Sequence, residues 1–365
     1  MYPGRHNTSD YAFVKQLVDA IAARGNDCYV LSPYNINHYR RYSSVKESYS
    51  VGEGSVTVLR PWYLSFSAKI KFLYRWGGKS HHRALQKAFL MLPHIPDVVY
   101  GHFWHGAYRG YRYAKEHGLP LFVASGESEI EFRRNSDNKS AFCDYVKGVI
   151  CVSSKNKDES ISLGLTTADR CIIAPNAINN NVFRKMDKTT CRKQLGLPAD
   201  VFIVCFVGWF IERKGPLRVS EAISRLDDVY SIFIGKGEQE PNCDRILFKG
   251  SVAHNQVPLY MNASDVFVLP TLHEGCCNAV VEAMACGLPI ISSNLPFNWD
   301  ILNEGNSIMI DPNSCDEITQ AIRKLRDDIE LRNLLSKGAL ETAQSLTIEK
   351  RAEIIEGFIK DQTSN

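Results

Sequence analysis

Short apolar segments rich in Val, Ile, Leu and Phe alternate along the chain with longer segments of helical periodicity. Several of the apolar segments end in Gly, Ser or Pro, which is typical of strands that run into loops. In the first half they cover residues 28–34, 55–61, 97–103, 119–127 and 148–154. In the second half they cover residues 171–178, 201–208, 230–237, 246–250, 265–270 and 288–293. This alternation predicts an α/β protein with parallel sheets and helices on both faces.

Two such series in succession predict two Rossmann-like domains that face each other across a cleft, where ligands bind at the carboxyl ends of the strands. The Asn- and Pro-containing stretch at 172–183 suits a linker between them. We therefore expect an N-terminal domain over residues 1–175, a C-terminal domain over 176–345 and a terminal helix over 346–365. No apolar strand precedes the first loop and helix, so the domain either begins further upstream or lacks its first strand.

The composition narrows the class of protein. The chain has 365 residues, of which 44% are hydrophobic and 23% charged, as in soluble globular proteins. Its net charge of +3 is too small to indicate nucleic-acid binding. The eleven cysteines are scattered without metal-binding spacing, which favours a reduced, cytoplasmic setting without a metal site. The longest apolar run, residues 201–211, is well short of the ~20 residues that a membrane-spanning helix needs.

The stretch "PTLHEGCCNAVVEAMACGLPIISS" at 270–293 carries the first candidate chemistry. It places Glu274 in the loop after a strand and Glu282 about one turn into the following helix. The backbone N–H groups of residues 276–278 begin that helix and offer an anion site. Carboxylates repel phosphate but bind hydroxyl groups well. The combination suits a sugar nucleotide, with the amides on the diphosphate, Glu282 on a ribose and Glu274 on the sugar hydroxyls.

The counter-charge comes earlier, in "FVGWFIERKGPLRVSEAI", where Arg213 and Lys214 lie at a turn between a strand and a helix. Two fixed cations there can neutralise a diphosphate and stabilise it as a leaving group. The stretch "IGKGEQ" at 234–239 is a second glycine-bearing turn after a strand. For Gly235 and Gly237, ordinary turn chemistry remains an equal alternative to a ligand contact.

Together and in this order, these segments resemble glycosyltransferase family 4 of the GT-B fold, over about residues 200–325. The resemblance implies a retaining, metal-independent transfer of a hexose-like sugar from a nucleotide-activated donor, with no cofactor. It implies that Arg213 and Lys214 bind the donor diphosphate, and that Glu274 and Glu282, the E-x7-E pair of the family, bind the sugar and the ribose. The donor-binding candidates are Gly208, Gly235, Phe248, Gly275, Cys277, Asn278 and Glu282. Many members carry arginine directly after the first glycine, where this chain has Trp209.

The N-terminal half resembles the family more loosely, through residues 2–33, 96–128 and 148–183. Ser125 stands where many members have a histidine, with Glu127 close by. The usual active-site histidine therefore has no counterpart, although in the retaining mechanism the donor's own phosphate can take the acceptor proton. The catalytic candidates are Arg213, Lys214, Glu274 and Glu127, the last as a group that orients the acceptor. His102 and His105 are acceptor-side candidates, with a structural role as the alternative. In this fold, a terminal helix often returns to the first domain.

Residues 54–96 contain no Asp or Glu but seven Lys or Arg residues. Phe66, Ile70, Leu73 and Tyr74 are spaced as an apolar stripe on a basic helix, the pattern of a membrane-surface element. We therefore expect residues 60–87 to contact an anionic membrane surface, which would suit a lipid-linked acceptor and a peripheral place on the inner face of the membrane. The alternative is a basic face packed against its own domain. No recognised nucleic-acid-binding module surrounds this segment, so we expect no nucleic-acid partner.

These observations predict a glycosyltransferase that moves a sugar to a glycan or lipid-linked acceptor in cell-surface polysaccharide biosynthesis. One alternative is a catalytically weakened homologue that binds sugar nucleotides or serves as a partner subunit, which Ser125 and the missing strand favour. Another is a sugar-nucleotide epimerase of the same fold, against which the context of Glu274 and Glu282 argues.

Overall fold

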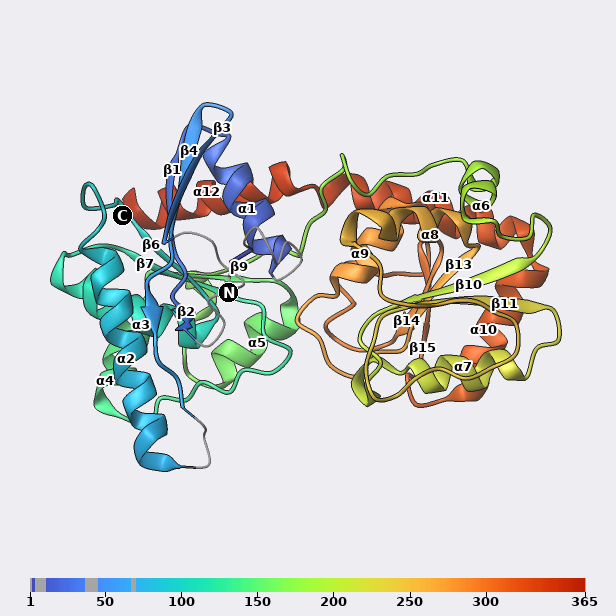
Figure 1. Ribbon diagram of the computed structural model, residues 1–365, viewed down its shortest axis with the longest axis horizontal. Helices are drawn as coiled ribbons and strands as arrows, with labels where there is room; N and C mark the ends of the chain where they lie inside the picture. The colour runs from blue at the N-terminus through green and yellow to red at the C-terminus, as the bar shows by residue number, and fades with distance from the viewer. Residues whose placement is uncertain (1, 4–10, 37–44, 67–69, 365) are drawn as a thin grey trace.

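The computed structural model describes residues 2–3, 11–36, 45–66 and 70–364, and within 71–75 it describes the backbone alone. Two α/β domains lie side by side along the long axis of the molecule (Figure 1). Strands and helices alternate through both domains, so the predicted α/β class is confirmed.

The C-terminal domain is built on one six-stranded sheet in the order β12-β11-β10-β13-β14-β15, in which every pair of neighbours is parallel. This is the 3-2-1-4-5-6 order of a doubly wound dinucleotide-binding fold. Its strands are β10 Phe202–Val207, β11 Val229–Ile234, β12 Ile246–Gly250, β13 Val266–Leu269, β14 Ile290–Ser293 and β15 Ser307–Ile310. Because β10, β13 and β14 are buried on both faces, their sequences read as nearly continuous apolar runs.

Helices on both faces cover this sheet (Figure 1). They are α6 Lys188–Leu195, α7 Pro216–Ser224, α8 Val257–Ala263, α9 Asn278–Ala285, α10 Cys315–Asp327 and α11 Ile329–Ser345, with short 3₁₀ turns at Glu212–Lys214 and His254–Gln256. The ends of α9 follow from its sequence. Its last turn is followed by Gly287 at φ 77°, a left-handed conformation that favours glycine, as expected from the sequence.

The N-terminal domain has a four-stranded parallel sheet in the order β6-β7-β8-β9 and smaller sheets beside it. The strands of the four-stranded sheet are β6 Val99–His102, β7 Leu121–Ser125, β8 Gly148–Cys151 and β9 Cys171–Ile173. A three-stranded sheet joins β1 Asp27–Leu31, β4 Gly54–Leu59 and β3 Lys46–Val51, and a two-stranded one joins β2 Tyr34–Asn35 and β5 Trp62–Tyr63. The helices are α1 Ala12–Ala22, α2 Lys71–Phe89, α3 Trp104–Glu116, α4 Asp137–Tyr145 and α5 Ser154–Ser162.

Every segment that the apolar pattern marked contains a strand, with two refinements. The segment 28–34 divides into β1 and the start of β2, and the polar-looking β3 and the short β5 and β15 were not predicted as strands. β3 alternates exposed and half-buried residues and pairs antiparallel with β4 as an edge strand. Its sequence "KESYSV" therefore lacks the apolar run by which the other strands were found.

The chain passes between the domains twice, at 174–187 and again near residue 347. The two passages are joined where Ile178 N–H donates to the Leu346 carbonyl at 2.9 Å and Ile348 N–H donates to the Ile178 carbonyl at 3.0 Å. After the second passage, α12 Ile348–Ser364 runs back over the N-terminal domain (Figure 1). There Phe358 packs edge-on against Phe122 of β7, and Glu356 accepts a hydrogen bond from Arg24 Nε at 2.7 Å.

Candidate functional site

The candidate site lies where the order of the C-terminal sheet reverses. β10 and β13 are neighbours there, and the chain leaves their carboxyl ends in opposite directions. The loop after β10 leads to the 3₁₀ turn that carries Arg213 and Lys214, and the loop after β13 carries Glu274. Such a reversal opens a crevice at the sheet edge in which ligands of this fold bind. The fold therefore brings together two motifs that are about sixty residues apart in sequence.

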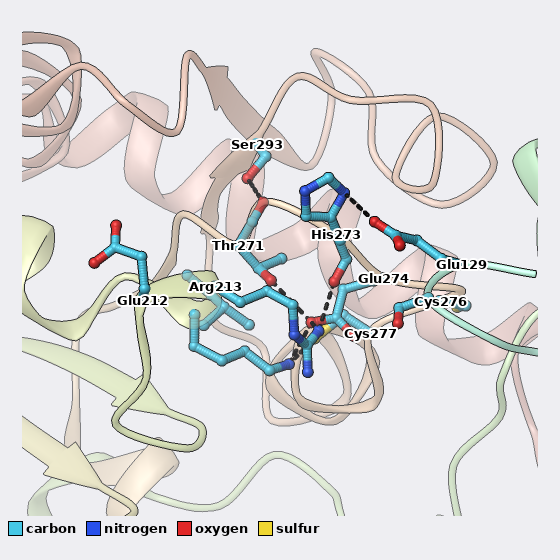
Figure 2. A network of polar contacts seen from close by, with 12 residues as sticks. Glu129, Glu212, Arg213, Thr271, His273, Glu274, Cys276, Cys277 and Ser293 are labelled. Carbon is cyan, nitrogen blue, oxygen red and sulfur yellow. Dashed lines mark hydrogen bonds and ion pairs between the residues drawn. The ribbon is translucent and has the colours of Figure 1, made fainter. Parts of the chain in front are cut away.

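One oxygen atom of Glu274 organises the polar network of the site (Figure 2). Its Oε1 accepts hydrogen bonds from Lys214 Nζ at 2.5 Å, from Arg213 Nη1 at 2.7 Å and from Thr271 Oγ1 at 2.8 Å. Thr271 is in turn fixed by Ser293, whose hydroxyl donates to the Thr271 carbonyl at 2.6 Å. The carboxylate is thereby held by two cations of the 3₁₀ turn after β10 and by a hydroxyl group of its own loop.

Lys214 is the buried cation of the site. Only 9% of its surface is exposed, whereas the Arg213 side chain remains about one-third exposed. Burial acts to lower the pKa of Lys214, but the neighbouring Cys277 and Glu274 act in the opposite direction and the net pKa is raised. The ammonium group is therefore kept charged in a place from which water is largely excluded. Such a group interacts strongly with an anion that replaces Glu274.

Glu282 lies on α9 and is paired with a histidine. Its Oε1 lies 3.0 Å from Nε2 of His254, which belongs to the 3₁₀ turn after β12. The hydrogen bond to Glu282 raises the pKa of His254. The His254 ring also packs edge-on against Phe183, with ring centroids 5.1 Å apart.

A pocket of ≈ 320 Å³ surrounds these groups and is bordered by both domains. Residues of α1 form its N-terminal-domain wall, and the end of β10, the loops after β10, β12 and β13, the start of α9 and Ala177 of the linker form the rest. The residues lining it are Ala12, Phe13, Gln16, Ala177, Val207, Gly208, Trp209, Lys214, His254, Glu274, Cys276, Cys277, Asn278, Ala279 and Glu282. Six residues predicted from the sequence are among them: Gly208, Lys214, Glu274, Cys277, Asn278 and Glu282. Arg213 reaches the pocket through its hydrogen bond to Glu274.

Three further donor-site candidates lie behind this lining. A Cβ on Gly235 would collide with the carbonyl oxygen of Gly208, so Gly235 lets the two glycine turns pack together. Phe248 packs against Tyr260 with ring centroids 4.6 Å apart. Gly275 lies against Gly126 of the other domain, where an added Cβ would come within 2.5 Å of the Gly126 carbonyl oxygen.

The N-terminal domain contributes three candidates, Glu127, His102 and His105. None of them is among the described residues that line the pocket. Glu127 accepts hydrogen bonds from the backbone N–H of Trp104 at 2.7 Å and of Gly126 at 3.0 Å, and so ties the loop after β7 to the start of α3. The hydroxyl of Ser125 lies 3.3 Å from the same carboxylate. Burial, opposed by these hydrogen bonds, raises the pKa of Glu127.

The two histidines differ in their surroundings. His102 ends β6, and burial together with the nearby charge of Arg351 lowers its pKa to about 4. It is therefore neutral at physiological pH. His105 is exposed on α3 and packs edge-on against Phe132, at 5.3 Å between ring centroids.

Three parts of the pocket were not predicted from the sequence. His254 carried no motif, Trp209 was noted only as a departure from the family pattern, and α1 was placed in the first domain without a role at the site. Trp209 is 57% exposed and lies under Lys236, whose Nζ is 5.5 Å from the ring centroid. The sequence did contain a signal for His254. This residue follows Gly250, which ends β12, and ligands of this fold bind at the carboxyl ends of strands.

Comparison with known proteins connects this geometry to a family. Residues 187–342, which include both cations and both glutamates, match the sequence model described as "Glycosyl transferases group 1". The resemblance to this family is therefore carried by the C-terminal domain. The chain is 24% identical to the "Putative teichuronic acid biosynthesis glycosyltransferase TuaC" of Bacillus subtilis, over 94% of this chain and 92% of TuaC. It is 28% identical to an Escherichia coli enzyme named "UDP-Gal:alpha-D-GlcNAc-diphosphoundecaprenol alpha-1,3-galactosyltransferase", over 60% of this chain and 61% of that one.

Solved structures share the fold of this chain. The sucrose-phosphate synthase of Thermosynechococcus elongatus superposes with a TM-score of 0.79 at 18% identity, over 100% of this chain and 96% of the synthase. HepE of Anabaena, crystallised with UDP and glucose, superposes with a TM-score of 0.67 at 18% identity, over 83% of this chain and 86% of HepE. The GT-B fold expected from the sequence is therefore confirmed.

Two features are absent from the part of the chain that the structure describes. No helix there is both long enough and apolar enough to cross a bilayer. No cluster of three or more His, Cys, Asp or Glu side chains with the geometry of a metal site occurs in it either.

Proposed function

We propose that the chain is a retaining, metal-independent glycosyltransferase that moves a hexose from a nucleoside diphosphate donor held in the pocket between its domains. The observation that carries this proposal is the convergence of Lys214 and Arg213 on Glu274 at the reversal of the sheet order. A buried ammonium group beside a carboxylate, next to the start of α9, provides sites for both a phosphate and a sugar hydroxyl.

In this proposal the diphosphate takes the place that Glu274 holds next to Lys214. Lys214 and Arg213 bind its oxygens, and the backbone N–H groups at the start of α9 bind the same anion. Glu274, once released from the cations, accepts hydrogen bonds from hydroxyls of the sugar. Glu282 faces the same pocket and accepts from the ribose.

The transfer itself needs little from the protein beyond positioning and charge stabilisation. The bond between the anomeric carbon and the phosphate oxygen breaks, and its electron pair leaves with the nucleoside diphosphate. The acceptor hydroxyl forms the new bond on the same face, and its proton passes to an oxygen of the leaving phosphate. Lys214 and Arg213 stabilise the charge that develops on that group. Glu127 and Ser125 serve in this scheme to hold the loop after β7, because their polar atoms are engaged with backbone and with each other.

The acceptor is proposed from the relatives. TuaC is named for teichuronic acid biosynthesis, and the Escherichia coli relative for a diphosphoundecaprenol-linked sugar acceptor. We assign the chain to cell-surface polysaccharide biosynthesis with a glycan or lipid-linked acceptor, acting in the cytoplasm at the inner face of the membrane. A weakened homologue that binds the donor without transferring its sugar is the competing function.

The test combines donor binding with turnover. Thermal unfolding is measured with UDP-, GDP-, ADP- and TDP-sugars, because a ligand at a hundred times its dissociation constant stabilises the folded state by about 2.7 kcal/mol. A thermal shift with one nucleotide class supports the donor site if Lys214→Ala abolishes it. The control variant Lys324→Ala, at an exposed position, should keep the shift. Absence of a shift with every donor contradicts it.

Turnover with lipid-linked acceptors then distinguishes the two functions. Nucleoside diphosphate release that depends on the acceptor, with a product whose anomeric configuration by NMR matches the donor, supports the retaining transferase. Donor binding without any acceptor-dependent release favours the weakened homologue, and an inverted product excludes the retaining mechanism.

A further inference from the structure

Large apolar side chains are exposed in unusual number along one part of the N-terminal domain. Trp62, Leu64 and Phe66 lie on and after β5, and Ile70 and Trp76 lie at and near the start of α2. The two tryptophans are 52% and 57% exposed. Leu90, directly after α2, is 86% exposed. Single exposed apolar side chains are ordinary, but a contiguous group of this kind marks a binding surface.

The outer face of α2 combines these apolar groups with positive charge. Trp76, Lys79, Arg83, Lys87 and Leu90 are spaced by three, four, four and three residues, and all five are exposed. This spacing places them in a single stripe along the helix. The opposite face is buried against the domain through Gly77, Ala84, Leu85 and Ala88. The stripe is therefore the surface that α2 presents to its surroundings.

The segment after β5 extends this surface beside the start of α2. Leu64 N–H donates to Ser80 Oγ at 3.0 Å, and Tyr63 packs edge-on against His81, with ring centroids 4.7 Å apart. Gly77 lies beside the same segment, since a Cβ there would make an ordinary van der Waals contact with the Cα of Ser65 at 3.4 Å. These contacts hold Trp62, Leu64 and Phe66 close to the end of α2 that carries Trp76.

The charge on this surface has one sign. Residues 54–96 contain no Asp or Glu, and no ion pair joins Lys79, Arg83 or Lys87 to another residue in the described part of the chain. Arg60, which the sequence placed in the same basic surface, is instead 3% exposed and pairs with Glu47 at 2.9 Å. The expected helical stripe through Phe66 is also wrong, because Phe66 precedes the helix. The side chains of Leu73 and Tyr74 lie outside the described residues.

We propose that this face, defined by Trp62, Leu64, Phe66, Ile70, Trp76, Lys79, Arg83, Lys87 and Leu90, docks on the surface of an anionic phospholipid bilayer. Tryptophans and smaller apolar side chains enter the boundary between headgroups and acyl chains, while the cations along α2 meet lipid phosphates. A protein partner fits less well, because the centres of protein interfaces are depleted in lysine. The proposal does not depend on the donor site.

The test uses co-sedimentation of the full chain with lipid vesicles. One set consists of neutral phosphatidylcholine, and the other contains phosphatidylglycerol as well. We expect binding to the anionic vesicles that weakens as salt is added. The triple variant Lys79→Gln/Arg83→Gln/Lys87→Gln should bind less, by roughly fivefold for each charge removed and on the order of a hundredfold in all. Trp76→Ser should lower binding while leaving the salt dependence unchanged.

A matched variant controls for net charge. Lys193→Gln/Arg323→Gln/Lys324→Gln removes the same charge from exposed sites on the C-terminal domain and should bind vesicles as the unmodified protein does. Donor-induced thermal shifts of all variants should be equal, which separates this proposal from that of the donor site. Equal vesicle binding by the two triple variants would overturn the docking face. So would equal binding to neutral and anionic vesicles, or a solution dimer that Trp76→Ser dissociates.

Discussion

Lys214 Nζ lies 2.5 Å from Oε1 of Glu274, so the cation assigned to the diphosphate and the carboxylate assigned to the sugar neutralise each other. Arg213 and Thr271 bind the same oxygen. The arrangement keeps a buried ammonium group paired, and in the proposed function a donor phosphate replaces the carboxylate. A single exchange of partners thus prepares both halves of the proposed donor site.

Lys214→Met should abolish donor turnover, because the leaving diphosphate loses its buried counter-charge. We expect kcat to fall on the order of a hundredfold to a thousandfold. The free energy of unfolding should fall by about 2 kcal/mol, since Glu274 loses one charged hydrogen bond but keeps Arg213 and Thr271. Adding Glu274→Gln should recover part of that stability without recovering turnover. Denaturant unfolding and nucleoside diphosphate release measure the two effects, and full turnover in Lys214→Met would refute the assignment.

The pair of His254 and Glu282 should make stability depend on pH. The hydrogen bond to Glu282 raises the folded-state pKa of His254 above its ordinary value of 6.5. The contribution of the pair is therefore complete below about pH 6.5 and is lost as the pH rises through the raised pKa. His254→Gln, which can bind Glu282 but does not titrate, should be less stable than the unmodified protein at pH 5.5 and close to it at pH 9.

Urea unfolding over this pH range measures the difference. His94→Gln serves as the control, because His94 is an exposed histidine that packs against Tyr29 and is not part of the pocket. A constant difference between His254→Gln and the unmodified protein at all pH values would mean that the pair does not titrate as a unit.

The amino-acid sequence was sufficient for the α/β class, for nearly all strands and for the C-terminal half of the site. Strands buried on both faces produce apolar runs that are visible without structural information, and the loops that follow them end at one sheet edge. Glu274, Lys214 and Glu282 could be assigned to a single site for this reason. The edge strand β3 was not predicted, because a strand that alternates exposed and half-buried residues has no continuous apolar run.

Contacts between segments that are distant in the chain could not be predicted from the sequence. His254 meets Glu282 across 28 residues, and α1 reaches the pocket from the other domain. Such juxtapositions are set by the packing of whole elements, and no local spacing encodes them. The contacts of Glu127 were also not visible in the sequence. Its carboxylate stands near an expected active-site position and accepts hydrogen bonds from backbone N–H groups of its own domain.

A chain of hydrogen bonds connects α12 to the donor loop, and Asn176→Asp should interrupt it selectively. Arg351 Nη1 donates to Asn176 Oδ1 at 2.8 Å, and Asn176 Nδ2 donates to the Cys276 carbonyl at 2.9 Å. Aspartate can still accept from Arg351 but presents an oxygen to the carbonyl in place of a donor. We expect the loop of Cys276 to shift and the KM for the donor to rise roughly tenfold, which corresponds to the loss of about one hydrogen bond.

Steady-state kinetics with circular dichroism tests this expectation. Asn181→Asp, at an exposed position of the same linker, makes the same chemical change away from the relay and should leave KM unchanged. An unchanged KM in Asn176→Asp would show that the loop is positioned without this relay.

The approach of Gly275 to Gly126 limits how closely the two domains meet, and Gly275→Ala should force them apart. The added Cβ would lie 2.5 Å from the Gly126 carbonyl oxygen and 3.0 Å from Cγ2 of Val152. The loops after β7 and β13 must then separate, which displaces the acceptor side relative to the donor. We expect turnover to fall on the order of tenfold to a hundredfold, because small displacements of reacting groups are costly.

The matched control is Gly106→Ala in α3, where an added Cβ meets nothing within 4 Å. That variant should keep full turnover and gain roughly 0.5–1 kcal/mol of stability, because alanine is favoured over glycine within a helix. Small-angle X-ray scattering reports the domain separation and a coupled assay reports the turnover. If Gly275→Ala were as active and as compact as Gly106→Ala, the contact between the two glycines would have no part in holding the domains for transfer.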